Sequence, residues 1–378
     1  MQKGKFLRAT AILLALGLLP ACGFAGELNT TAPFETALET AGKMGIGWNL
    51  GNTFDAIGNA RSGVNSETAW GNPKTTEALI KAVKDAGFDT VRIPITWLNH
   101  FDSEYKIDEA WLERVKTVVQ YVTDNGMYAI INMHHDGQAE NGWLKPTFTG
   151  DEREAMVDQF TTLWAQIAEY FKDCGGNVLF AGMNEFHDGY YQPYPQDFDD
   201  LTNRLNQAFV DTVRATGGNN ATRILIFQTY NTLPEAAPRT TVPTDATPGY
   251  LMLEAHYYQP WTFAGEGGGK WGSDGNKLMV DLLCKQLKRN FVDKGIPVVM
   301  GEYGAVITDN PDRIEYIRYV TEAFVKSGII PCWWDNGYLT SGNELFGLMD
   351  RATDTVGDPV ALEAIMAAKS QATPYDAE

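Results

Sequence analysis

Two glutamates follow short runs of apolar residues with one residue between, at a place where a carboxylate is costly without a use. Glu185 comes after the run 178–183, and Glu302 comes after the run 297–300. Short apolar runs bounded by turn residues are typical of strands that are buried on both faces. A carboxylate at the end of such a strand must be paired, solvated or functional. For Glu185 alone, a side chain that turns into solvent explains the pattern as well as a catalytic role does.

Further polar and aromatic residues interrupt the other apolar runs, almost always at their carboxyl ends. These residues are Asn49, Arg92, His134, Asn184, His256, Tyr258 and Trp334. Each has a structural explanation by itself, such as a buried ion-pair partner for Arg92 or a core position for Trp334. In a parallel barrel, however, the carboxyl ends of the strands meet at one mouth, which is where active sites of this architecture lie. The joint pattern therefore favours an active site.

The residue types indicate acid–base and nucleophilic chemistry on an acetal. The sequence offers two strand-ending carboxyls, and it has no metal-ligand spacing and no nucleophilic serine or cysteine motif. Such chemistry needs one carboxyl protonated near neutral pH and the other ionised. A guanidinium at Arg92 would keep Glu302 ionised and nucleophilic. Glu185 would be the acid and later the base, and Asn184 would hydrogen-bond the 2-hydroxyl group of the sugar.

A metal centre is the main alternative reading of the adjacent residues His134 and His135. The chain has only 5 histidines, and neighbours in a strand point to opposite faces, so these two cannot easily bind one ion. We therefore expect neither a metal nor another cofactor. His134 is expected to contact the sugar, and His135 to have a structural or supporting role.

Tryptophan is frequent in the loop-like regions of the sequence, at Trp70, Trp97, Trp143, Trp261 and Trp271. Flat apolar rings stack on the C–H faces of pyranose rings, so a row of them in a cleft favours a polysaccharide substrate. Hydrophobic packing of long loops explains any single one of them equally well.

An alternation of short apolar runs with longer amphipathic stretches must position these residues. The predicted strands are 44–50, 90–95, 128–133, 178–183, 223–227, 251–255, 297–300 and 329–334. The predicted helices are 75–86, 108–124, 151–172, 198–216, 276–291, 311–326 and 359–369. Strand–helix repeats with buried strands predict an α/β fold, a (β/α)₈ TIM barrel forming a single catalytic domain. A doubly wound open sheet is disfavoured, because Gly45 and Gly47 lie inside the first run and no third glycine follows in place.

The N-terminal segment reads as an export signal. Basic residues precede an apolar run, 11–19, that is too short to span a bilayer. Cys22 stands where a bacterial lipoprotein signal has its lipidated cysteine, so residues 1–22 are predicted to be a signal peptide. Ordinary cleavage near Ala25 is the alternative. Either way we expect an extracellular or cell-surface protein, attached to a membrane only through a lipid on Cys22.

The remaining sequence is divided into a polar linker, 23–35, and the barrel domain, 36–372. The net charge of −18 argues against a nucleic-acid partner. Apart from Cys22, the cysteines are Cys174, Cys284 and Cys332, an odd and widely spaced set that does not suggest disulfides. We expect Cys284 and Cys332 to be small buried apolar residues, and the protein to be a monomer.

Ordered motifs along the chain resemble glycoside hydrolase family 5, and in particular its subfamily 4 of bacterial endoglucanases. The motifs are Trp70-Gly71-Asn72-Pro73, Val91-Arg92-Ile93-Pro94, Asn132-Met133-His134-His135, Asn184-Glu185, His256-Tyr257-Tyr258, Gly301-Glu302-Tyr303-Gly304 and Trp333-Trp334-Asp335-Asn336-Gly337. The resemblance spans about residues 36–368. Asn-Glu alone would be a weak signal, whereas this ordered set is specific.

The resemblance implies a role for each matching residue. Glu185 matches the acid/base of the family and Glu302 its nucleophile. The supporting residues that match are Arg92, His134, Asn184, His256, Tyr258 and Trp334, with His135, Asn52 and Trp48 as further contacts. Trp334 is preferred over Trp333 as the residue that faces the sugar. The family cleaves internal β-1,4 bonds by double displacement with retention and needs no metal.

The resemblance leaves the polysaccharide open. Subfamily 4 is similar to enzymes that act on cellulose, mixed-linkage β-glucan, xyloglucan and sometimes xylan, so we expect a β-glucan substrate. The loops that would decide are 54–66, 137–149, 186–195 and 259–275. A xyloglucan- or mannan-specific endohydrolase with the same machinery is an alternative. An alternative of another class is a non-catalytic glycan-binding surface lipoprotein, which the intact Glu185 and Glu302 disfavour.

Overall fold

The computed structural model describes residues 33–59, 62–137, 142–189 and 194–372. The predicted signal peptide with Cys22, and the predicted linker up to residue 32, lie outside the described residues. The described chain makes contacts from Phe34 onward, because the Phe34 N–H donates to Thr222 Oγ1 and its carbonyl accepts from the Tyr250 hydroxyl. The last residues of the predicted linker are therefore packed against the barrel.

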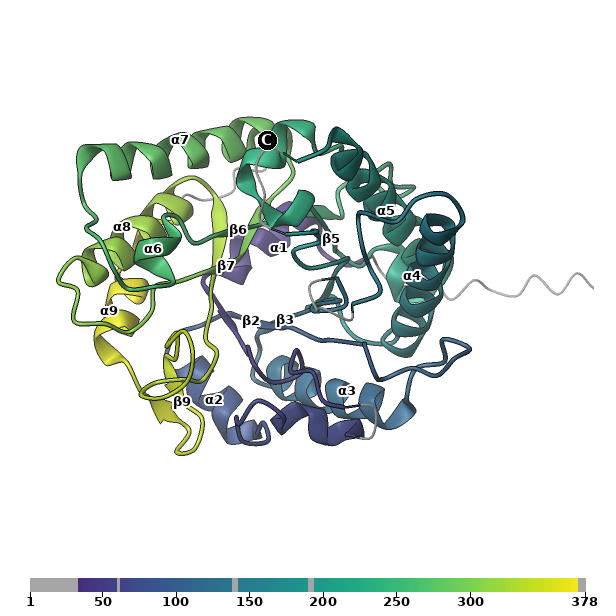
Figure 1. Cartoon of the computed structure of the whole chain (residues 1–378), viewed down its shortest axis with the longest axis horizontal. Helices are drawn as coiled ribbons and strands as arrows, with labels where there is room; N and C mark the ends of the chain where they lie inside the picture. The colour runs from purple at the N-terminus through teal and green to yellow at the C-terminus, as the bar shows by residue number, and fades with distance from the viewer. Residues whose placement is uncertain (1–32, 60–61, 138–141, 190–193, 373–378) are drawn as a thin grey trace, which may run out of the picture. The chain divides into compact units, whose positions relative to one another are not determined.

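Eight parallel strands of the described chain close into a barrel, each pairing with the next in sequence and β8 with β1 (Figure 1). The strands are β1 (Gly47–Asn49), β2 (Thr90–Ile93), β3 (Tyr128–Ile131), β4 (Val178–Ala181), β5 (Leu225–Gln228), β6 (Leu251–Tyr257), β7 (Val298–Tyr303) and β8 (Ile329–Trp333). This topology confirms the predicted TIM barrel. Most strands are one or two residues shorter than predicted, whereas β6 and β7 extend further toward the mouth.

Helices surround the barrel and connect successive strands (Figure 1). They are α2 (Glu77–Asp85), α3 (Glu109–Asp124), α4 (Gly150–Tyr170), α5 (Gln196–Ala215), α7 (Asp274–Asn290), α8 (Arg313–Lys326) and α9 (Pro359–Ala367). Side-chain caps at Thr76, Asp108 and Ser273 fix the first turns of α2, α3 and α7. Every helix that the sequence predicts is present, with ends shifted by a few residues.

The repeat after β5 departs from the strand–helix pattern. The fully described stretch 229–250 contains only two short 3₁₀ segments, η3 (Tyr230–Thr232) and η4 (Pro234–Arg239). Pro234 and Pro238 lack the N–H that an α-helix needs, so this connection cannot close regular α-helical turns. Short additional elements in the other loops are η1 (Gly63–Thr68), η2 (Gly218–Ala221), α6 (Trp261–Ala264), η5 (Val292–Lys294), β9 (Met349–Asp350), β10 (Thr355–Val356) and η6 (Lys369–Gln371).

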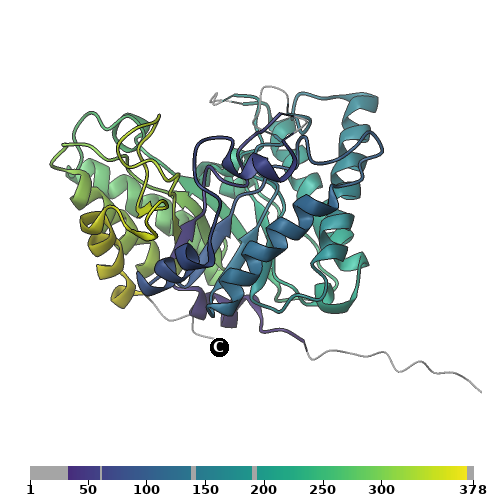
Figure 2. The ribbon, with the colours of Figure 1, turned by 90° about the horizontal axis from the view of Figure 1, so that it is seen from below.

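A helix that the sequence analysis missed closes the end of the barrel where the strands begin. Residues Ala37–Met44 form α1, which starts with a capping box between Thr36 and Glu39. The predicted first strand therefore began too early, because Met44 is the last residue of this helix. In Figure 2, α1 is the purple helix at the lower edge of the barrel. Its Ala37 N–H donates to the Gly249 carbonyl, just before β6.

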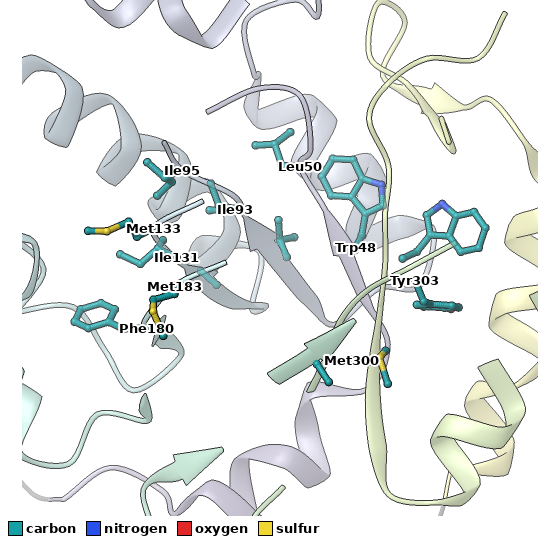
Figure 3. Close-up of a cluster of buried hydrophobic side chains, with 14 of the residues drawn as sticks. Trp48, Leu50, Ile93, Ile95, Ile131, Met133, Phe180, Met183, Met300 and Tyr303 are labelled. Carbon is teal, nitrogen blue, oxygen red and sulfur yellow. The ribbon is translucent and has the colours of Figure 1, made fainter. Parts of the chain in front are cut away.

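The side chains inside the barrel form two layers. The lower layer is apolar and packs on α1; its strand residues include Ile130, Leu179, Ile226, Met252, Val299 and Ile330. The upper layer is polar and consists of Asn49, Arg92, Gln228, Glu254, His256 and Glu302, each buried. Outward-facing side chains such as Trp48, Phe180 and Tyr303 form a separate hydrophobic cluster toward the helices (Figure 3).

Two irregularities in strand pairing lie at the upper layer. The register shifts between Ala255 and His256, and again between Met300 and Tyr303, and beyond the first shift His256 pairs with Glu302. Bulges of this kind redirect side chains and are frequent next to active sites. Here they bring a histidine and a carboxylate from neighbouring strands to the same level of the barrel.

The cysteine and membrane-span expectations can be compared with the described part of the chain. Cys284 and Cys332 are buried, as predicted, and Cys174 is partly buried; all are free thiols. No helix among the described residues is both long and apolar enough to cross a bilayer.

Candidate active site

Glu302 stands at the end of β7 and is held by donors from two other strands. Arg92 Nη1 donates to Glu302 Oε1 at 2.9 Å, and the Tyr258 hydroxyl donates to Glu302 Oε2 at 3.0 Å. His134 Nε2 lies 3.9 Å from Glu302 Oε1. Only 5% of the Glu302 surface is exposed. The carboxylate is therefore fixed in orientation by hydrogen bonds from both sides of the barrel.

Arg92 connects Glu302 to the rest of the upper layer. Its Nη1 also donates to Asn49 Oδ1 at 3.0 Å, and its Nη2 donates to Asn184 Oδ1 at 2.7 Å. Its Nε forms an ion pair with Glu254 Oε1 at 2.8 Å. The guanidinium is completely buried, and burial of a charge is tolerated only when such partners surround it.

Glu185 follows β4 and faces His256. His256 Nδ1 lies 2.9 Å from Glu185 Oε1 and 3.7 Å from Glu302 Oε2. The Glu185 side chain is 15% exposed, so it is the more accessible of the two carboxyls. Its backbone φ of 23° is rare for a residue with a side chain. Strained conformations of this kind are tolerated where the surrounding structure fixes them, frequently at active sites.

Burial and the neighbouring charges move the pKa values of this cluster in different directions. Burial alone lowers the pKa of His256, but Glu302, Glu185 and Glu254 outweigh it and raise the pKa to about 9. Burial raises the pKa of Glu185, and the hydrogen bond from His256 overcomes this and lowers it below the ordinary value. Burial also raises the pKa of Glu302, against the opposing charges of His256 and Arg92.

These directions differ from the order expected from the sequence, in which Glu185 was the protonated group. The raised pKa of His256 and the lowered pKa of Glu185 favour a proton on His256 over one on Glu185. His256 lies between both carboxyls through contacts of distant segments, which no local pattern in the sequence indicates. A proton on His256 is one hydrogen bond away from Glu185. Glu185, His256 and Glu302 therefore titrate together and not as separate groups.

His134 is a neutral side chain whose tautomer follows from its neighbours. Asn132 Oδ1 accepts the Ile95 N–H, so its Nδ2 faces His134 Nδ1 as a donor at 3.1 Å. The proton of His134 is therefore on Nε2, on the side of Glu302. Burial lowers the pKa of His134 well below its ordinary value, and the nearby His135 and Arg92 lower it further.

Two groups of described side chains have the spacing of metal ligands. One is Asp55 with His134 and His135, and the other is Glu185 with His256 and Glu302; within each, the ligand atoms lie within 4.8 Å of one another. In the first group Asn132 occupies His134 Nδ1. In the second, a cation would lie beside the Arg92 guanidinium that already binds Glu302. Neither donor set fits a metal ion well.

A cavity of about 910 Å³ opens above the two carboxyls. Its lining residues include Glu185, Glu302, His134, His135, His256, Tyr258 and Trp334, all predicted from the sequence. The predicted residues Arg92 and Asn184 lie under this floor, where Asn184 is 1% exposed. Among the described residues none accepts a hydrogen bond from Asn184 Nδ2.

Two predicted contacts lie elsewhere. Trp48 is completely buried on the outer face of β1, where its Nε1 donates to Asp335 Oδ2 at 2.7 Å (Figure 3). The assignment of Trp48 to the site was wrong, because side chains alternate along a strand and Asn49 is the inward residue. Asn52 lies beyond the end of β1, where its N–H donates to Asp55 and its carbonyl accepts from Asn72.

The same alternation separates Trp333 from Trp334. Trp333 is completely buried and packs edge-on against Tyr303 with ring centroids 5.5 Å apart. Trp334 lines the cavity and lies parallel to His134 at 5.9 Å. The structure thus places Trp334, the residue preferred from the sequence, toward the cavity.

The loop tryptophans divide into two groups. Trp70 and Trp261 line the cavity, and 45% of the Trp261 surface is exposed. Trp97 is completely buried and Trp271 nearly so, while Trp143 packs edge-on against Phe101. The packing explanation therefore holds for the second group, and only Trp70 and Trp261 remain available to a sugar.

Sequence reasoning missed several residues of the site. Glu254 and Gln228 belong to the upper layer, and Asn132 orients His134. Glu254 could have been found in the sequence. It is a lone carboxylate inside an apolar run, and His256, two positions later, lies on the same face of the strand. The cavity-lining residues of the β5 loop, such as Asn231 and Pro234, follow no pattern that distinguishes them from other loop residues.

Comparison with known proteins places the chain among polysaccharide-degrading enzymes. Residues 54–339 match the family described as cellulase (glycosyl hydrolase family 5). Endoglucanase A of Ruminococcus albus is 41% identical over 348 residues, which are 86% of this chain and 92% of that protein.

Solved structures show the same similarity over nearly the whole barrel. A GH5-4 broad specificity endoglucanase from Ruminococcus champanellensis, with bound cellotriose, aligns with a TM-score of 0.82 at 37% identity over 89% of this chain and 100% of that one. A family 5 xyloglucanase from Paenibacillus pabuli, in complex with ligand, gives a TM-score of 0.81 at 36% identity over 87% and 99% of the two chains.

Proposed function

This chain belongs to glycosyl hydrolase family 5, and we propose that Glu185 is the acid/base and Glu302 the nucleophile of its reaction. The enzyme is an endo-β-1,4-glucanase, and hydrolysis in this family retains the anomeric configuration. What remains to be assigned is how the residues of this chain perform the reaction and which glucan they prefer.

The spacing of the two carboxyls is the observation that carries the assignment. A carboxylate oxygen of Glu185 and one of Glu302 lie within 4.8 Å of each other. Retaining glycosidases hold their carboxyls about 5–5.5 Å apart, so that one can attack the sugar directly, whereas inverting enzymes leave about 6.5–9.5 Å for a water molecule. The short spacing supports direct attack by one carboxylate.

In the first half of the reaction Glu302 attacks the anomeric carbon as the glycosidic C–O bond breaks. Arg92 and the Tyr258 hydroxyl hold the attacking carboxylate in place. Glu185 gives its proton to the leaving oxygen, which takes the electron pair of the broken bond. The product is a sugar ester of Glu302 and a shortened glucan chain. Glu185 is suited to the acid role because it is the carboxyl closer to solvent.

In the second half Glu185 takes a proton from water, and the resulting nucleophile displaces Glu302 from the anomeric carbon. His256 stands 2.9 Å from Glu185 and can hold the proton taken from water until the next turnover. Asn184 offers its Nδ2 to the sugar 2-hydroxyl, because its Oδ1 is already engaged by Arg92. Hydrogen bonds to the 2-hydroxyl strengthen in the transition state and so lower the barrier.

The cavity walls support a neutral, extended glucan. Flat rings at Trp70, Trp261 and Trp334 line the cavity and can stack on pyranose faces. We propose that unsubstituted and mixed-linkage β-glucans are the main substrates, as the broad specificity of the R. champanellensis relative suggests. A preference for xyloglucan is the second candidate, because the chain is nearly as similar to the P. pabuli xyloglucanase.

The test is the initial rate of reducing-end release by a protein that begins at residue 27. Mixed-linkage β-glucan, carboxymethyl cellulose, xyloglucan and glucomannan are compared, with Glu302→Ala as the inactive control. We expect release from the first two at rates well above the others, and a loss of more than about 10⁴-fold in the variant. Faster release from xyloglucan would favour the second candidate. Release from glucomannan alone, or equal rates for wild type and variant, would contradict the proposal.

Export and oligomeric state complete the proposal. We propose that residues 1–22 direct export, that Cys22 carries a lipid, and that the enzyme is a monomer. Mass spectrometry of the mature N-terminus from the producing cells tests the lipid, with cleavage near Ala25 as the alternative outcome. Light scattering after gel filtration tests the monomer.

A further inference from the structure

Glu254 is a buried carboxylate beneath the two carboxyls assigned to the reaction. It lies on β6, two residues before His256 and on the same face of the strand, and none of its surface is exposed. Its Oε1 is 2.8 Å from Arg92 Nε and 3.3 Å from His256 Nε2. Its Oε2 accepts from Gln228 Nε2 at 3.0 Å. Arg92 and Gln228 present N–H donors, and His256 Nε2 can either donate or accept, so the position suits an acceptor that is an anion.

The neighbouring strand leaves room for this carboxylate. A Cβ atom on Gly301 of β7 would lie 1.9 Å from Glu254 Oε1, so only glycine fits at that position. Burying a carboxylate costs several kcal/mol unless partners compensate for it. Charged or polar groups from β2, β5 and β6 surround Glu254. The layer is therefore arranged around a negative charge that does not line the cavity.

We propose that Glu254 is a positioning residue that keeps a proton on His256 Nε2 and thereby helps the His256–Glu185 pair retain the proton that Glu185 donates. This inference rests on the acid/base role proposed for Glu185. It adds a residue that touches neither the substrate nor the reacting atoms.

The two ring nitrogens of His256 face different carboxyl groups, Nδ1 that of Glu185 and Nε2 that of Glu254. A neutral imidazole has a single N–H. When that hydrogen is on Nε2, it faces Glu254. A second proton then lies between His256 Nδ1 and Glu185, which are 2.9 Å apart. The negative charge of Glu254 attracts that proton, which moves along this bond to Glu185 and from there to the leaving oxygen. The pKa of about 9 for His256 agrees with a strongly held proton.

Other titratable groups face His256 from the surrounding strands, and they act in both directions. Arg92 on β2, His134 after β3, Glu185 after β4 and Glu302 on β7 act on His256 itself, whereas Tyr258 after β6 and Cys332 on β8 act on Glu302. Arg92 repels the proton, and Glu302 attracts it. Neutralising Glu254 removes an attractive charge and leaves the repulsion from Arg92 in place. The pair must then lose its proton at lower pH.

The first test is the pH dependence of kcat/KM on a soluble β-glucan. In Glu254→Gln we expect the alkaline limb to move to lower pH by about one unit or more, the effect of removing one close charge. Glu254→Asp keeps the charge and should keep the limb near its wild-type position. The matched control is Met252→Leu, on the same face of β6 but in the lower layer; its profile should equal that of the wild type.

A profile of Glu254→Gln that has the wild-type pH limbs, whatever its kcat, would overturn the proposal and leave Glu254 with a structural role. The second test needs neither the variant nor any activity. Nitrogen NMR of the wild-type protein, with the His256 signals identified by their loss in His256→Gln, should show a protonated Nε2 from about pH 5 to 9. An unprotonated Nε2 in that range would refute the proposal. A protonated Nε2 in a protein that cleaves no β-glucan would instead refute the proposed function alone.

Discussion

The same strands build the lower and the upper layer of the barrel interior, but the lower layer is apolar and the upper layer is polar. Ile226 and Met252 pack in the hydrophobic cluster of the lower layer. Two residues further along the same strands, Gln228 and Glu254 belong to the upper layer and are joined by a hydrogen bond. The lower layer gains free energy by burial, whereas the upper layer buries charges and must compensate for them.

The difference indicates how the fold tolerates its active site. The charges of the upper layer offset one another in part: Arg92 and His256 stand among the three carboxyl groups of Glu254, Glu185 and Glu302. The apolar lower layer with α1, and the larger hydrophobic cluster between the strands and the outer helices, stabilise the fold by burial. Changes in the upper layer should therefore alter chemistry at a constant fold, and changes in the lower layer should alter stability at constant chemistry.

The largest effect is expected for Glu185→Ala in the upper layer. Activity on polysaccharide should fall about 10²–10⁴-fold, the range for loss of a general acid. An aryl cellobioside with a good leaving group does not need the proton, so its bond cleavage should be nearly normal. Added azide should then release β-glycosyl azide from the ester on Glu302. An equal loss on both substrates, without rescue by azide, would remove Glu185 from the acid role.

The opposite result is expected for Ile226→Ala in the lower layer. The side chain is fully buried, and its truncation should cost about 2–5 kcal/mol of unfolding free energy. Because no group of the upper layer moves, kcat and the pH profile at 25 °C should match the wild type. Urea unfolding and steady-state kinetics measure both quantities. A variant with normal stability and altered kcat would break the separation between the layers.

His256 and His100, a histidine outside the barrel, should change the stability of the protein in opposite pH ranges. Burial lowers the pKa of His100, which stacks on Trp111 at 3.8 Å, to about 4, whereas that of His256 is raised to about 9. Each shift from the ordinary 6.5 corresponds to roughly 3 kcal/mol. The His256 contribution is fully present below pH 6.5 and lost as pH rises to 9. The lowered pKa of His100 reduces the free energy of unfolding as pH falls from 6.5 to 4, because the unfolded chain then binds a proton that the folded protein does not.

Melting temperature as a function of pH checks both signs. His100→Phe keeps an aromatic ring beside Trp111, and it should flatten the acid side of the curve while leaving the alkaline side as in the wild type. His256→Gln should flatten the alkaline side. If either variant altered the other side of the curve, the assigned pKa directions would be incorrect.

The smallest effect is expected at the rim of the cavity. Trp261→Ala removes a ring that is 45% exposed and that packs on Tyr258 at 5.9 Å. We expect a severalfold rise in KM for β-glucan, from the loss of about 1 kcal/mol of stacking, with kcat nearly unchanged. Trp271→Ala is the control, because Trp271 is buried against Tyr316 and should affect stability instead. A larger change in kcat than in KM would place Trp261 closer to the chemistry.

Periodicity in the sequence was sufficient to predict the barrel and most of the upper layer. Arg92, Glu185 and Glu302 each stand in or just after an apolar run. Such a pattern identifies a strand and also the end of it that lies at the active-site mouth, because the mouth is formed by the carboxyl ends of the strands. Alternation within a strand also distinguishes Trp334 from Trp333. The error at Trp48 came from neglecting the same rule on β1.

The rest depended on contacts between distant segments. The helix α1 was missed although Thr36 and Glu39 have the spacing of a capping box and Gly45 follows its last residue, because Met44 was assigned to the apolar run that follows. The pKa directions of His256 and Glu185 could not be expected from the sequence, because they depend on a contact between β6 and the end of β4, next to a shift in register. Glu254 was missed although its sequence signal resembled that of Arg92.

The most direct measurement of the central claim is covalent trapping of the nucleophile. A 2-deoxy-2-fluoro-β-cellobioside with a dinitrophenyl leaving group forms the sugar ester and then hydrolyses slowly, because fluorine destabilises both transition states while the good leaving group speeds only the first. Peptide mass spectrometry of the trapped enzyme should find one added cellobiosyl group, on Glu302. A label on Glu185 or on any other residue, or an inverted product with no adduct, would contradict the account.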